Sequence, residues 1–266
     1  MFNAPADHRL TQKCSQPTNS IQPTSVAFTG ETVRARVVSM PSNWLTTTRI
    51  ARSCHSPDHG RRCTLGAMSA WPPPSGTPTE QFATTGAAVL GRVLDDDQLA
   101  TARAAFTELL PFGTTGGYAT IVHDGWRRAP ALAALVPTVG RAAAAAVGVP
   151  ALVLFHEHLL WKPPGGEAMA WHQDYSYLPL DRPDGCTLWI ALDDCDATNG
   201  CIFYQLATHT SGEYRAAWGI WEDDDPRAAL PPLPLGDGDL GLPAPTAAGH
   251  AIAHHTLTFH RSPANH

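Results

Sequence analysis

The sequence predicts a mainly β fold, an antiparallel jelly-roll barrel with helices packed ahead of it in the chain. After residue 150, short apolar segments alternate with turns rich in Gly, Pro, Asn and Asp, which is typical of consecutive strands. No helical pattern separates these segments, which favours an antiparallel barrel or sandwich over an alternating α/β fold. With 266 residues, 43% of them hydrophobic, the chain can build one such domain.

The first 67 residues differ in composition from the rest of the chain. They are rich in Ser, Thr, Pro and Arg and carry a net charge of +5, whereas residues 68–266 carry −11. Such a composition buries too little apolar surface to offset the entropy lost on ordering. We expect a disordered leader or a gene-model artefact upstream of a natural start at Met68; an organelle-targeting leader is the disfavoured alternative. Residues 68–80 are expected to be a Pro-rich linker and residues 81–266 the folded domain.

A short strand and a helix are predicted ahead of the barrel strands. Residues 86–90 (Gly-Ala-Ala-Val-Leu) form an apolar run of strand length. Asp95 begins a helix as its N-cap, with Gln98 three residues later in position for a capping box. Apolar residues at helical spacing continue this helix to about Leu110.

A Gly-rich loop and a second helix are expected next. Residues 113–117 lack the Lys-Ser/Thr pair of a phosphate-binding loop, so we expect a plain loop there. The Ala-rich residues 129–147 predict a helix that is broken or bent near Pro137 and ended by Gly148. Both helices are expected to pack on the barrel.

The remaining chain is expected to supply the barrel strands. Residues 151–162 are predicted to form one long strand, and further strands are predicted at 186–192 and 201–206. Residues 222–248 are acidic and then rich in Pro, Gly and Ala, which indicates a long loop or insertion. Long loops in compact domains are either lids or simple solvated loops, and the sequence leaves both alternatives open.

A metal site is predicted at His172-Gln173-Asp174. Residues i and i+2 of a strand point to the same face, so His172 and Asp174 can reach one ion. One imidazole and one carboxylate are two of the three ligands that hold a non-heme Fe(II) and leave positions open. A third ligand must come from elsewhere, and alternation along the last strand places both His254 and His260 on its inner face.

The residues around this motif resemble those of the phytanoyl-CoA dioxygenase family. The matching segments are residues 162–166 (Lys-Pro-Pro-Gly-Gly), 171–175 (Trp-His-Gln-Asp-Tyr), 188–194 (Leu-Trp-Ile-Ala-Leu-Asp-Asp), 198–201 (Thr-Asn-Gly-Cys) and 254–262, which ends in His-Arg-Ser. The resemblance covers roughly residues 80–266 and implies a cupin-like double-stranded β-helix, the jelly roll of Fe(II)- and 2-oxoglutarate-dependent oxygenases.

The resemblance also implies roles for individual residues. Fe(II) would be held by His172, Asp174 and His260, with His254 as the alternative to His260 as the third ligand. The residues implied at the 2-oxoglutarate site are His158, Lys162, Trp189 and Ser262. His158 departs from the apolar residue expected at its position, and a neutral imidazole there could donate one hydrogen bond.

The implied reaction consumes O2 and 2-oxoglutarate, releases succinate and CO2, and hydroxylates a small organic substrate. Asp174 favours hydroxylation, because related halogenases have a small residue at that position. Candidates for an aromatic substrate pocket are Tyr175, Tyr177, Trp218 and Trp221, although buried aromatic residues more often belong to a core.

One departure from the family concerns the far carboxylate of 2-oxoglutarate. The family fixes it with an Arg about ten residues after the distal histidine, whereas this sequence ends six residues after His260. We expect a domain truncated at its C-terminus, or a site in which Lys162 replaces the Arg. Two further alternatives are a cupin-like barrel that uses a divalent metal without redox chemistry, and a catalytically impaired protein that binds metal alone.

Composition bears on partners and location. The net charge of −6 argues against nucleic acid as a partner. No run approaches 18 uninterrupted apolar residues, so no membrane partner is expected. The six Cys show no regular spacing, which is typical of reduced thiols in the cytoplasm. We expect a small-molecule substrate as the partner, and no protein partner is evident.

Overall fold

The computed structural model describes residues 76–218, 224–236 and 238–266. The predictions for residues 1–67, and for most of the linker at 68–80, lie outside these described residues. The end of the linker prediction is wrong, because helix α1 already begins at Pro78. Thr77 and Glu80 form a capping box at the start of α1. The sequence prediction missed this helix start because the segment is rich in proline.

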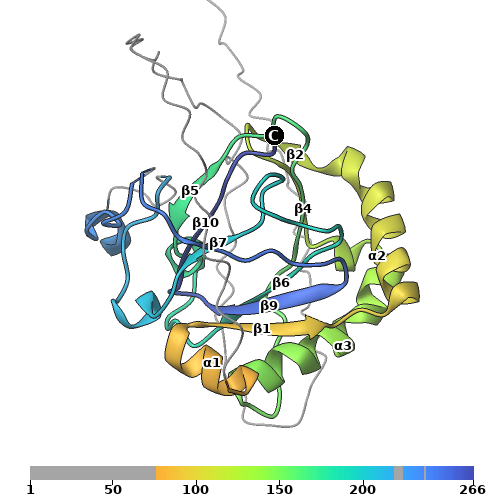
Figure 1. The fold of residues 1–266 in the computed structure, drawn as a ribbon, viewed down its shortest axis with the longest axis horizontal. Helices are drawn as coiled ribbons and strands as arrows, with labels where there is room; N and C mark the ends of the chain where they lie inside the picture. Colours follow the sequence, from red (N-terminus) through yellow and green to blue (C-terminus); the bar gives the residue numbers. More distant parts are fainter. Residues whose placement is uncertain (1–75, 219–223, 237) are drawn as a thin grey trace, which may run out of the picture.

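The centre of the molecule is built from antiparallel strands, as predicted (Figure 1). One sheet has the order β1-β9-β6, with bounds Ala87–Arg92, His250–His255 and Cys186–Ile190. A second has the order β5-β10-β7-β8, with bounds Met169–His172, Phe259–Ser262, Phe203–Gln205 and Leu242–Pro243. A third has the order β2-β3-β4, with bounds Thr114–Thr115, Thr120–His123 and His158–Trp161.

Three helices line the outside of these sheets, and Figure 1 shows them along one side and the lower edge. Their bounds are Pro78–Thr85 (α1), Asp96–Leu109 (α2) and Pro130–Val147 (α3). The capping box of α2 at Asp95 and Gln98 is confirmed. Helix α3 runs unbroken through Pro137 and ends at Gly148 in the left-handed conformation, so the predicted break is absent.

Short 3-10 turns join the larger elements. Their bounds are Leu110–Phe112 (η1), Gly125–Arg127 (η2), Tyr175–Tyr177 (η3), Thr208–Thr210 (η4) and Pro226–Ala229 (η5). Segment 222–248 was predicted as a long loop, and its described part holds η5 and β8 joined by irregular chain. The role of this segment as a lid stays a prediction.

Apolar residues form the core in separate layers. Leu99, Leu109 and Leu132 bring α2 and α3 together in the helical layer. Ile252 and Tyr204 belong to a cluster between the two larger sheets, inside the barrel.

Among the described residues, helix α3 is long and apolar enough to cross a membrane, judged by length and composition alone. In the structure it packs against α1, α2 and β6. The prediction of no membrane partner is left untested.

The strand predicted over residues 151–162 is wrong for most of its length. Only His158–Trp161 pairs, because its partner β3 is four residues long and the pairing ends at His123 and His158. One further backbone bond, from Asp124 N to the carbonyl of Glu157 at 2.8 Å, follows that pair, and residues 151–157 belong to no strand. The loop predicted at 113–117 likewise contains the short strand β2.

The last predicted strand is two strands in different sheets. Strand β9 ends at His255, and β10 begins at Phe259 after a turn in which Thr258 N donates to the carbonyl of His255 at 2.8 Å. The buried Thr258 hydroxyl donates to the carbonyl of Gly86 at 2.7 Å and anchors this turn. The chain therefore crosses from the β1-β9-β6 sheet to the β5-β10-β7-β8 sheet between His254 and His260.

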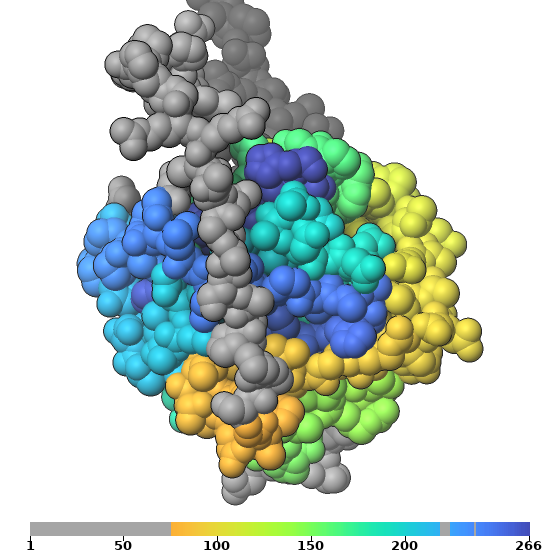
Figure 2. Space-filling model, viewed as in Figure 1, coloured from red at the N-terminus to blue at the C-terminus, as the bar shows by residue number. Residues whose placement is uncertain are grey.

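Residues 162–166 lie beside the end of the chain. Gly165 N donates to the carbonyl of Asn265 at 2.7 Å, and Asn265 N donates to the carbonyl of Gly166 at 3.0 Å. Figure 2 shows the dark blue C-terminal residues against the green segment at the top of the molecule. These contacts hold the Lys-Pro-Pro-Gly segment next to the strand that carries His260.

Candidate metal centre

His172, Asp174 and His260 come together as the sequence predicts. His172 and His260 are cross-strand partners on β5 and β10, and both are buried. The Oδ1 atom of Asp174 lies 3.7 Å from Nε2 of His172 and 3.4 Å from Nε2 of His260. One candidate ligand atom from each side chain lies within 4.8 Å of the others, and no other such group occurs in the described part of the chain.

Asp174 reaches this position from outside the strand. Strand β5 ends at His172, and Asp174 has helical φ and ψ of −63° and −39° as the N-cap of η3. The predicted convergence of His172 and Asp174 is confirmed, whereas their placement in one strand is wrong. This helical turn places the Asp174 carboxylate next to the imidazoles of His172 and His260.

Backbone carbonyls fix the tautomer of both histidines. Nδ1 of His172 lies 2.9 Å from the carbonyl oxygen of Ala170, and Nδ1 of His260 lies 2.9 Å from that of Thr258. A carbonyl oxygen only accepts, so each Nδ1 carries the proton and donates. Nε2 of each ring is therefore the nitrogen on the Asp174 side that is left for a divalent metal, which binds histidine through a deprotonated ring nitrogen.

The charges of the cluster also suit a cation. Burial lowers the pKa of His172 to about 3, so its imidazole is neutral at pH 7. Burial alone would raise the pKa of Asp174, but the nearby His260 and His254 hold it well below its usual range. Burial opposes protonation of His260, yet the Asp174 charge raises the pKa of that histidine. The carboxylate therefore stays ionised and attracts positive charge to this point.

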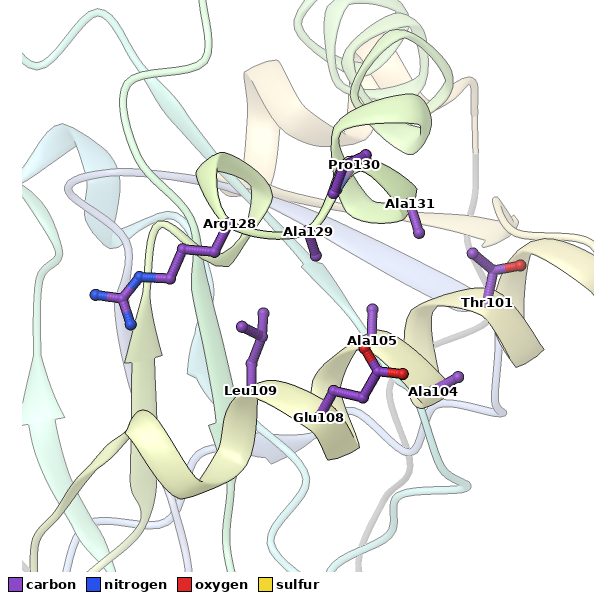
Figure 3. A pocket seen from close by; sticks show the side chains of 9 residues that line it. All are labelled: Thr101, Ala104, Ala105, Glu108, Leu109, Arg128, Ala129, Pro130 and Ala131. Carbon is purple, nitrogen blue, oxygen red and sulfur yellow. The ribbon is translucent and has the colours of Figure 1, made fainter.

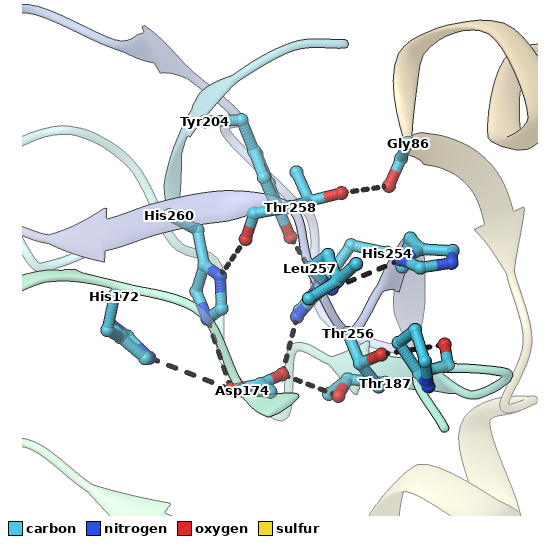
Figure 4. A network of polar contacts seen from close by, with 12 residues as sticks. Gly86, His172, Asp174, Thr187, Tyr204, His254, Thr256, Leu257, Thr258 and His260 are labelled. Carbon is cyan, nitrogen blue, oxygen red and sulfur yellow. Dashed lines mark hydrogen bonds and ion pairs between the residues drawn. The ribbon is translucent and has the colours of Figure 1, made fainter. Parts of the chain in front are cut away.

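His254 holds the carboxylate from the other side (Figure 4). Its Nε2 lies 3.0 Å from Oδ2 of Asp174, and its Nδ1 lies 2.9 Å from the Tyr204 hydroxyl. The Thr187 hydroxyl donates to the same Oδ2 at 2.6 Å. The structure thus supports His260, and His254 contacts the ligand Asp174. Sequence reasoning missed Thr187 and Tyr204, because only the three-dimensional register brings them here.

Lys162 and Ser262, both predicted at the cosubstrate site, contact each other. Nζ of Lys162 donates to Ser262 Oγ at 2.6 Å and to the carbonyl of Pro263 at 2.6 Å. Ser262 Oγ in turn donates to the carbonyl of Gly200 at 2.8 Å. Burial lowers the pKa of Lys162 to about 8, and no carboxylate among the described residues pairs with it.

The other two predicted cosubstrate residues lie on different strands. The His158 ring on β4 is 4.5 Å from the His123 ring and 4.3 Å from the His156 ring, measured between centroids. Solvent still reaches His158, but the surrounding protein lowers its pKa to about 3, so it is neutral at pH 7. Trp189 lies on β6 two residues after Thr187, on the same face, and packs against the Ile252 cluster. Contact of His158 and Trp189 with 2-oxoglutarate stays a prediction.

Aromatic rings flank one metal ligand. The centroids of Tyr177 and Trp218 each lie 6.0 Å from that of His172. Trp218 is 42% exposed and lies nearly parallel to Tyr118, with an interplanar angle of 11° and centroids 6.4 Å apart. The Tyr177 hydroxyl accepts from the backbone N–H of Ala217 at 2.8 Å, which holds this segment in place.

The remaining aromatic predictions have different outcomes. Tyr175 is a buried core residue, and its hydroxyl donates to the carbonyl of Leu180. Trp221 lies outside the described residues. Tyr118 was not predicted, because it is far from the motifs in sequence and reaches the site through tertiary packing.

A separate hollow lies in the helical layer between α2 and the start of α3 (Figure 3). It has a volume of about 370 Å³, and its ionisable lining residues are Glu108 and Arg128. It contains none of the predicted site residues and no pair of metal-ligating side chains at metal distance. The chemistry of this chain is therefore assigned to the barrel interior.

The model of one protein family, phytanoyl-CoA dioxygenase (PhyH), matches residues 82–266. This chain belongs to that family. The family consists of non-heme iron oxygenases that depend on 2-oxoglutarate. The match includes every strand of the described residues and begins within helix α1. The fold class and the family resemblance found in the sequence are both confirmed.

Named relatives of the family match the chain over part of its length. The phytanoyl-CoA dioxygenase domain-containing protein 1 of Rattus norvegicus is 32% identical over 159 residues, which are 56% of this chain and 51% of the relative. Phytanoyl-CoA dioxygenase 1 of Oryza sativa subsp. japonica is 31% identical over 98 residues, 37% of this chain and 34% of the relative. The chain spans about half the length, or less, of the curated relatives that it matches.

Solved structures of other enzymes share the fold. The 2-oxoglutarate-dependent carbocyclase SnoK from nogalamycin biosynthesis has a TM-score of 0.59 and 24% identity, covering 75% of this chain and 81% of that one. The epimerase SnoN from the same biosynthesis has a TM-score of 0.57 and 22% identity, covering 70% and 75%. SnoN has also been crystallised with Fe3+, 2-oxoglutarate and nogalamycin RO.

The iron and 2-oxoglutarate of this family suit the residues present. The donor set is the Nε2 atoms of two imidazoles and one carboxylate oxygen, which is the set that a facially bound Fe(II) requires. The half-buried ammonium of Lys162 pairs with no described carboxylate, and it lies beside Ser262, two residues beyond the candidate ligand His260. The residues of this chain therefore fit both an iron ion and 2-oxoglutarate.

Proposed function

We propose that this chain is an Fe(II)- and 2-oxoglutarate-dependent dioxygenase that hydroxylates a small organic substrate and releases succinate and CO2. The observation that carries the proposal is the cluster of His172, Asp174 and His260, in which Nδ1 of each histidine bonds a backbone carbonyl and Nε2 of each faces one carboxylate oxygen. Membership in a family of 2-oxoglutarate-dependent oxygenases supports the same reaction class.

In the proposed site, His172, Asp174 and His260 would hold the metal through one atom each. When bound, the iron supplies the oxidation that couples decarboxylation of 2-oxoglutarate to hydroxylation. His172 and His260 contribute Nε2, and Asp174 contributes Oδ1, since its Oδ2 already accepts from Thr187 and His254. Burial of the cluster keeps bulk water away from the reacting atoms.

We further propose that Lys162 binds the far carboxylate of 2-oxoglutarate, in place of the family's Arg. Ser262 is two residues beyond His260 on β10, a separation of about 6–7 Å along a strand. That distance suits a five-carbon dicarboxylate whose ketoacid end is at the metal. The carboxylate would accept from Nζ of Lys162 and from Ser262 Oγ, which now donates to Gly200.

His158 and Trp189 complete the proposed cosubstrate site. His158 is neutral, so it would donate a single hydrogen bond and add no charge. Trp189 shares a strand face with Thr187, which contacts Asp174, so its indole would form an apolar side of the same cavity. These two roles rest on their place in the fold and on the family resemblance.

The substrate side of the metal is proposed to accept an apolar or aromatic ring. Trp218 lies next to His172 and is partly open to solvent, and Tyr118 lies nearly parallel to Trp218. Burial raises the pKa of Tyr118 and raises that of Tyr177 to about 12, so both phenols are uncharged at pH 7. A neutral aromatic surface favours an uncharged ring over a small anion.

The proposed reaction is tested by measuring succinate and CO2 released from Fe(II), 2-oxoglutarate and O2 without an organic substrate. We expect slow turnover by the full chain and none by Asp174→Ala, since that variant lacks the ligand carboxylate. Iron bound without any turnover would contradict the dioxygenase proposal and favour a protein that only binds metal. Turnover of an organic compound with Zn2+ and without 2-oxoglutarate would favour non-redox chemistry.

The substrate proposal is tested with Trp218→Ala. Compounds of two kinds, neutral aromatic molecules and aliphatic acids, are screened for those that stimulate succinate release by the unaltered chain. We expect aromatic compounds to stimulate succinate release. Trp218→Ala should need a roughly 2- to 12-fold higher concentration of such a compound for the same stimulation, because stacking contributes about 0.5–1.5 kcal/mol beyond buried area. Stimulation by aliphatic acids alone, unchanged in Trp218→Ala, would refute the aromatic assignment.

A further inference from the structure

Two cross-strand pairs from different sheets meet at Asp174. His172 and His260 are partners between β5 and β10, and they face Oδ1 of the carboxylate. Thr187 and His254 are partners between β6 and β9, and both contact Oδ2. In the proposed function, His172 and His260 are metal ligands, whereas Thr187 and His254 are not.

We propose that His254, oriented by Tyr204, is a positioning residue that makes Asp174 a ligand through a single oxygen. Oδ2 accepts from the Thr187 hydroxyl at 2.6 Å and from Nε2 of His254 at 3.0 Å. Two donors occupy the acceptor capacity of that oxygen, and Oδ1 is left for the metal. The inference rests on the proposed function in one respect, that a metal binds at this cluster.

The direction of each hydrogen bond follows from the chemistry of the partners. An ionised carboxylate only accepts, so Nε2 of His254 must carry a hydrogen and donate to Asp174. In the neutral ring Nδ1 is then the acceptor, and the Tyr204 hydroxyl, 2.9 Å away, donates to it. Tyr204 therefore selects the tautomer of His254 that can hold the carboxylate.

Burial makes this arrangement rigid. Tyr204 and His254 are 0% and 1% exposed. Tyr204 on β7 is the cross-strand partner of His260 on β10. The Tyr204 ring contacts the rings of both His254 and His260, with centroids 5.4 and 6.0 Å apart. A buried donor that lost its partner would be costly, so each member keeps the next in one orientation (Figure 4).

The experiment measures Co2+ affinity and the visible absorption spectrum of bound Co2+ in the full chain. We compare His254→Phe, which removes both ring nitrogens, with His254→Gln, whose amide N–H reaches the same carboxylate. Tyr204→Phe removes the hydroxyl that selects the tautomer. His255→Phe is the matched control, because this neighbouring ring contacts Phe82 and His209.

We expect His254→Phe to raise the Kd for Co2+ by roughly 10–100-fold and to alter the spectrum, as loss of a partner to a metal ligand does. Tyr204→Phe is expected to weaken binding by a smaller factor, His254→Gln to restore most of the affinity, and His255→Phe to stay near the unaltered value. Thermal unfolding of the metal-free variants separates these effects from lost stability.

The inference fails if folded His254→Phe binds Co2+ with the Kd and spectrum of the unaltered chain. Should that variant not fold, Tyr204→Phe decides in the same way, because it removes one hydroxyl and keeps the ring. If the unaltered chain binds no Co2+, the proposed function fails and this inference with it. Metal bound equally by the unaltered chain and by both variants overturns the positioning role alone.

Discussion

Each histidine ligand is oriented by the backbone two residues before it. His172 donates to the carbonyl of Ala170 and His260 to that of Thr258, both at 2.9 Å. The same local contact therefore sets both tautomers, without help from distant residues. Asp174 differs, because its orientation depends on Thr187 and His254, which other strands supply.

At the residue scale, Lys162 gives a prediction for pH dependence. Its pKa is lowered to about 8 by burial alone, and the groups facing Nζ, Ser262 and the carbonyl of Pro263, do not titrate. A far carboxylate needs the protonated ammonium, so the Kd of 2-oxoglutarate should be constant below pH 8. Above pH 8 it should rise, approaching tenfold per pH unit for one proton.

Two substitutions separate charge from structure at this position. Lys162→Arg stays protonated, so its Kd for 2-oxoglutarate, measured by anaerobic calorimetry, should be flat through pH 9. Lys162→Met should bind roughly 10–100-fold more weakly at pH 7, as expected for loss of a hydrogen bond to a charged group. Equal affinity in Lys162→Met and the unaltered chain would remove Lys162 from the cosubstrate site.

The three metal ligands could be predicted from the sequence, whereas their support could not. His172, Asp174 and His260 stand in short segments that match a family pattern. Thr187 and Tyr204 are ordinary strand residues, and only the register of β6 and β7 brings them to the site. Lys162 and Ser262 were predicted separately, and their direct contact appears only in the folded chain.

At the element scale, the turn between β9 and β10 decides how the two sheets meet. Alternation through Thr256 and Thr258 continues the strand pattern, so the sequence predicts one strand from His254 to His260. The structure bends the chain there, because the Thr258 hydroxyl bonds the carbonyl of Gly86 in a segment far away in sequence. Local patterning contains no signal for such a contact.

Thr258→Val tests the importance of this turn. It keeps the shape of the side chain but removes one of two donors to the carbonyl of Gly86, which still accepts from His255 N at 2.8 Å, so it should cost about 0.5–1.5 kcal/mol. The melting temperature should fall by roughly 2–4 °C for each kcal/mol. Thr258→Ser should recover most of this loss, and Thr210→Val, at an exposed hydroxyl, should change little. No difference between Thr258→Val and Thr210→Val would show that the turn does not depend on this bond.

Strand length shows a second limit of prediction from the sequence. Residues 151–162 have the composition of a long strand, yet only His158–Trp161 pairs, since β3 offers four residues. Helix α2 was predicted closely, because its start depends on Asp95 and Gln98 alone. Elements set by local capping are predictable, and elements set by a partner's length are not.

At the scale of the whole molecule, the metal centre lies where the two larger sheets meet. Asp174 receives contacts from a pair of residues in each sheet, so a bound ion would connect both sheets through one carboxylate. The helices cover the outside and leave the barrel interior for chemistry (Figure 1). The nature of residues 1–67, truncation at the C-terminus and the cytoplasmic location stay predictions.

The measurement that tests the central claim most directly is the fate of isotopically labelled oxygen. The full chain is incubated with Fe(II), 2-oxoglutarate and 18O2, and the succinate is analysed by mass spectrometry. A dioxygenase places one oxygen atom of O2 in the succinate carboxylate for each CO2 released, so we expect singly labelled succinate that is absent with Asp174→Ala. Unlabelled succinate, or none from iron-loaded protein, would contradict the assignment.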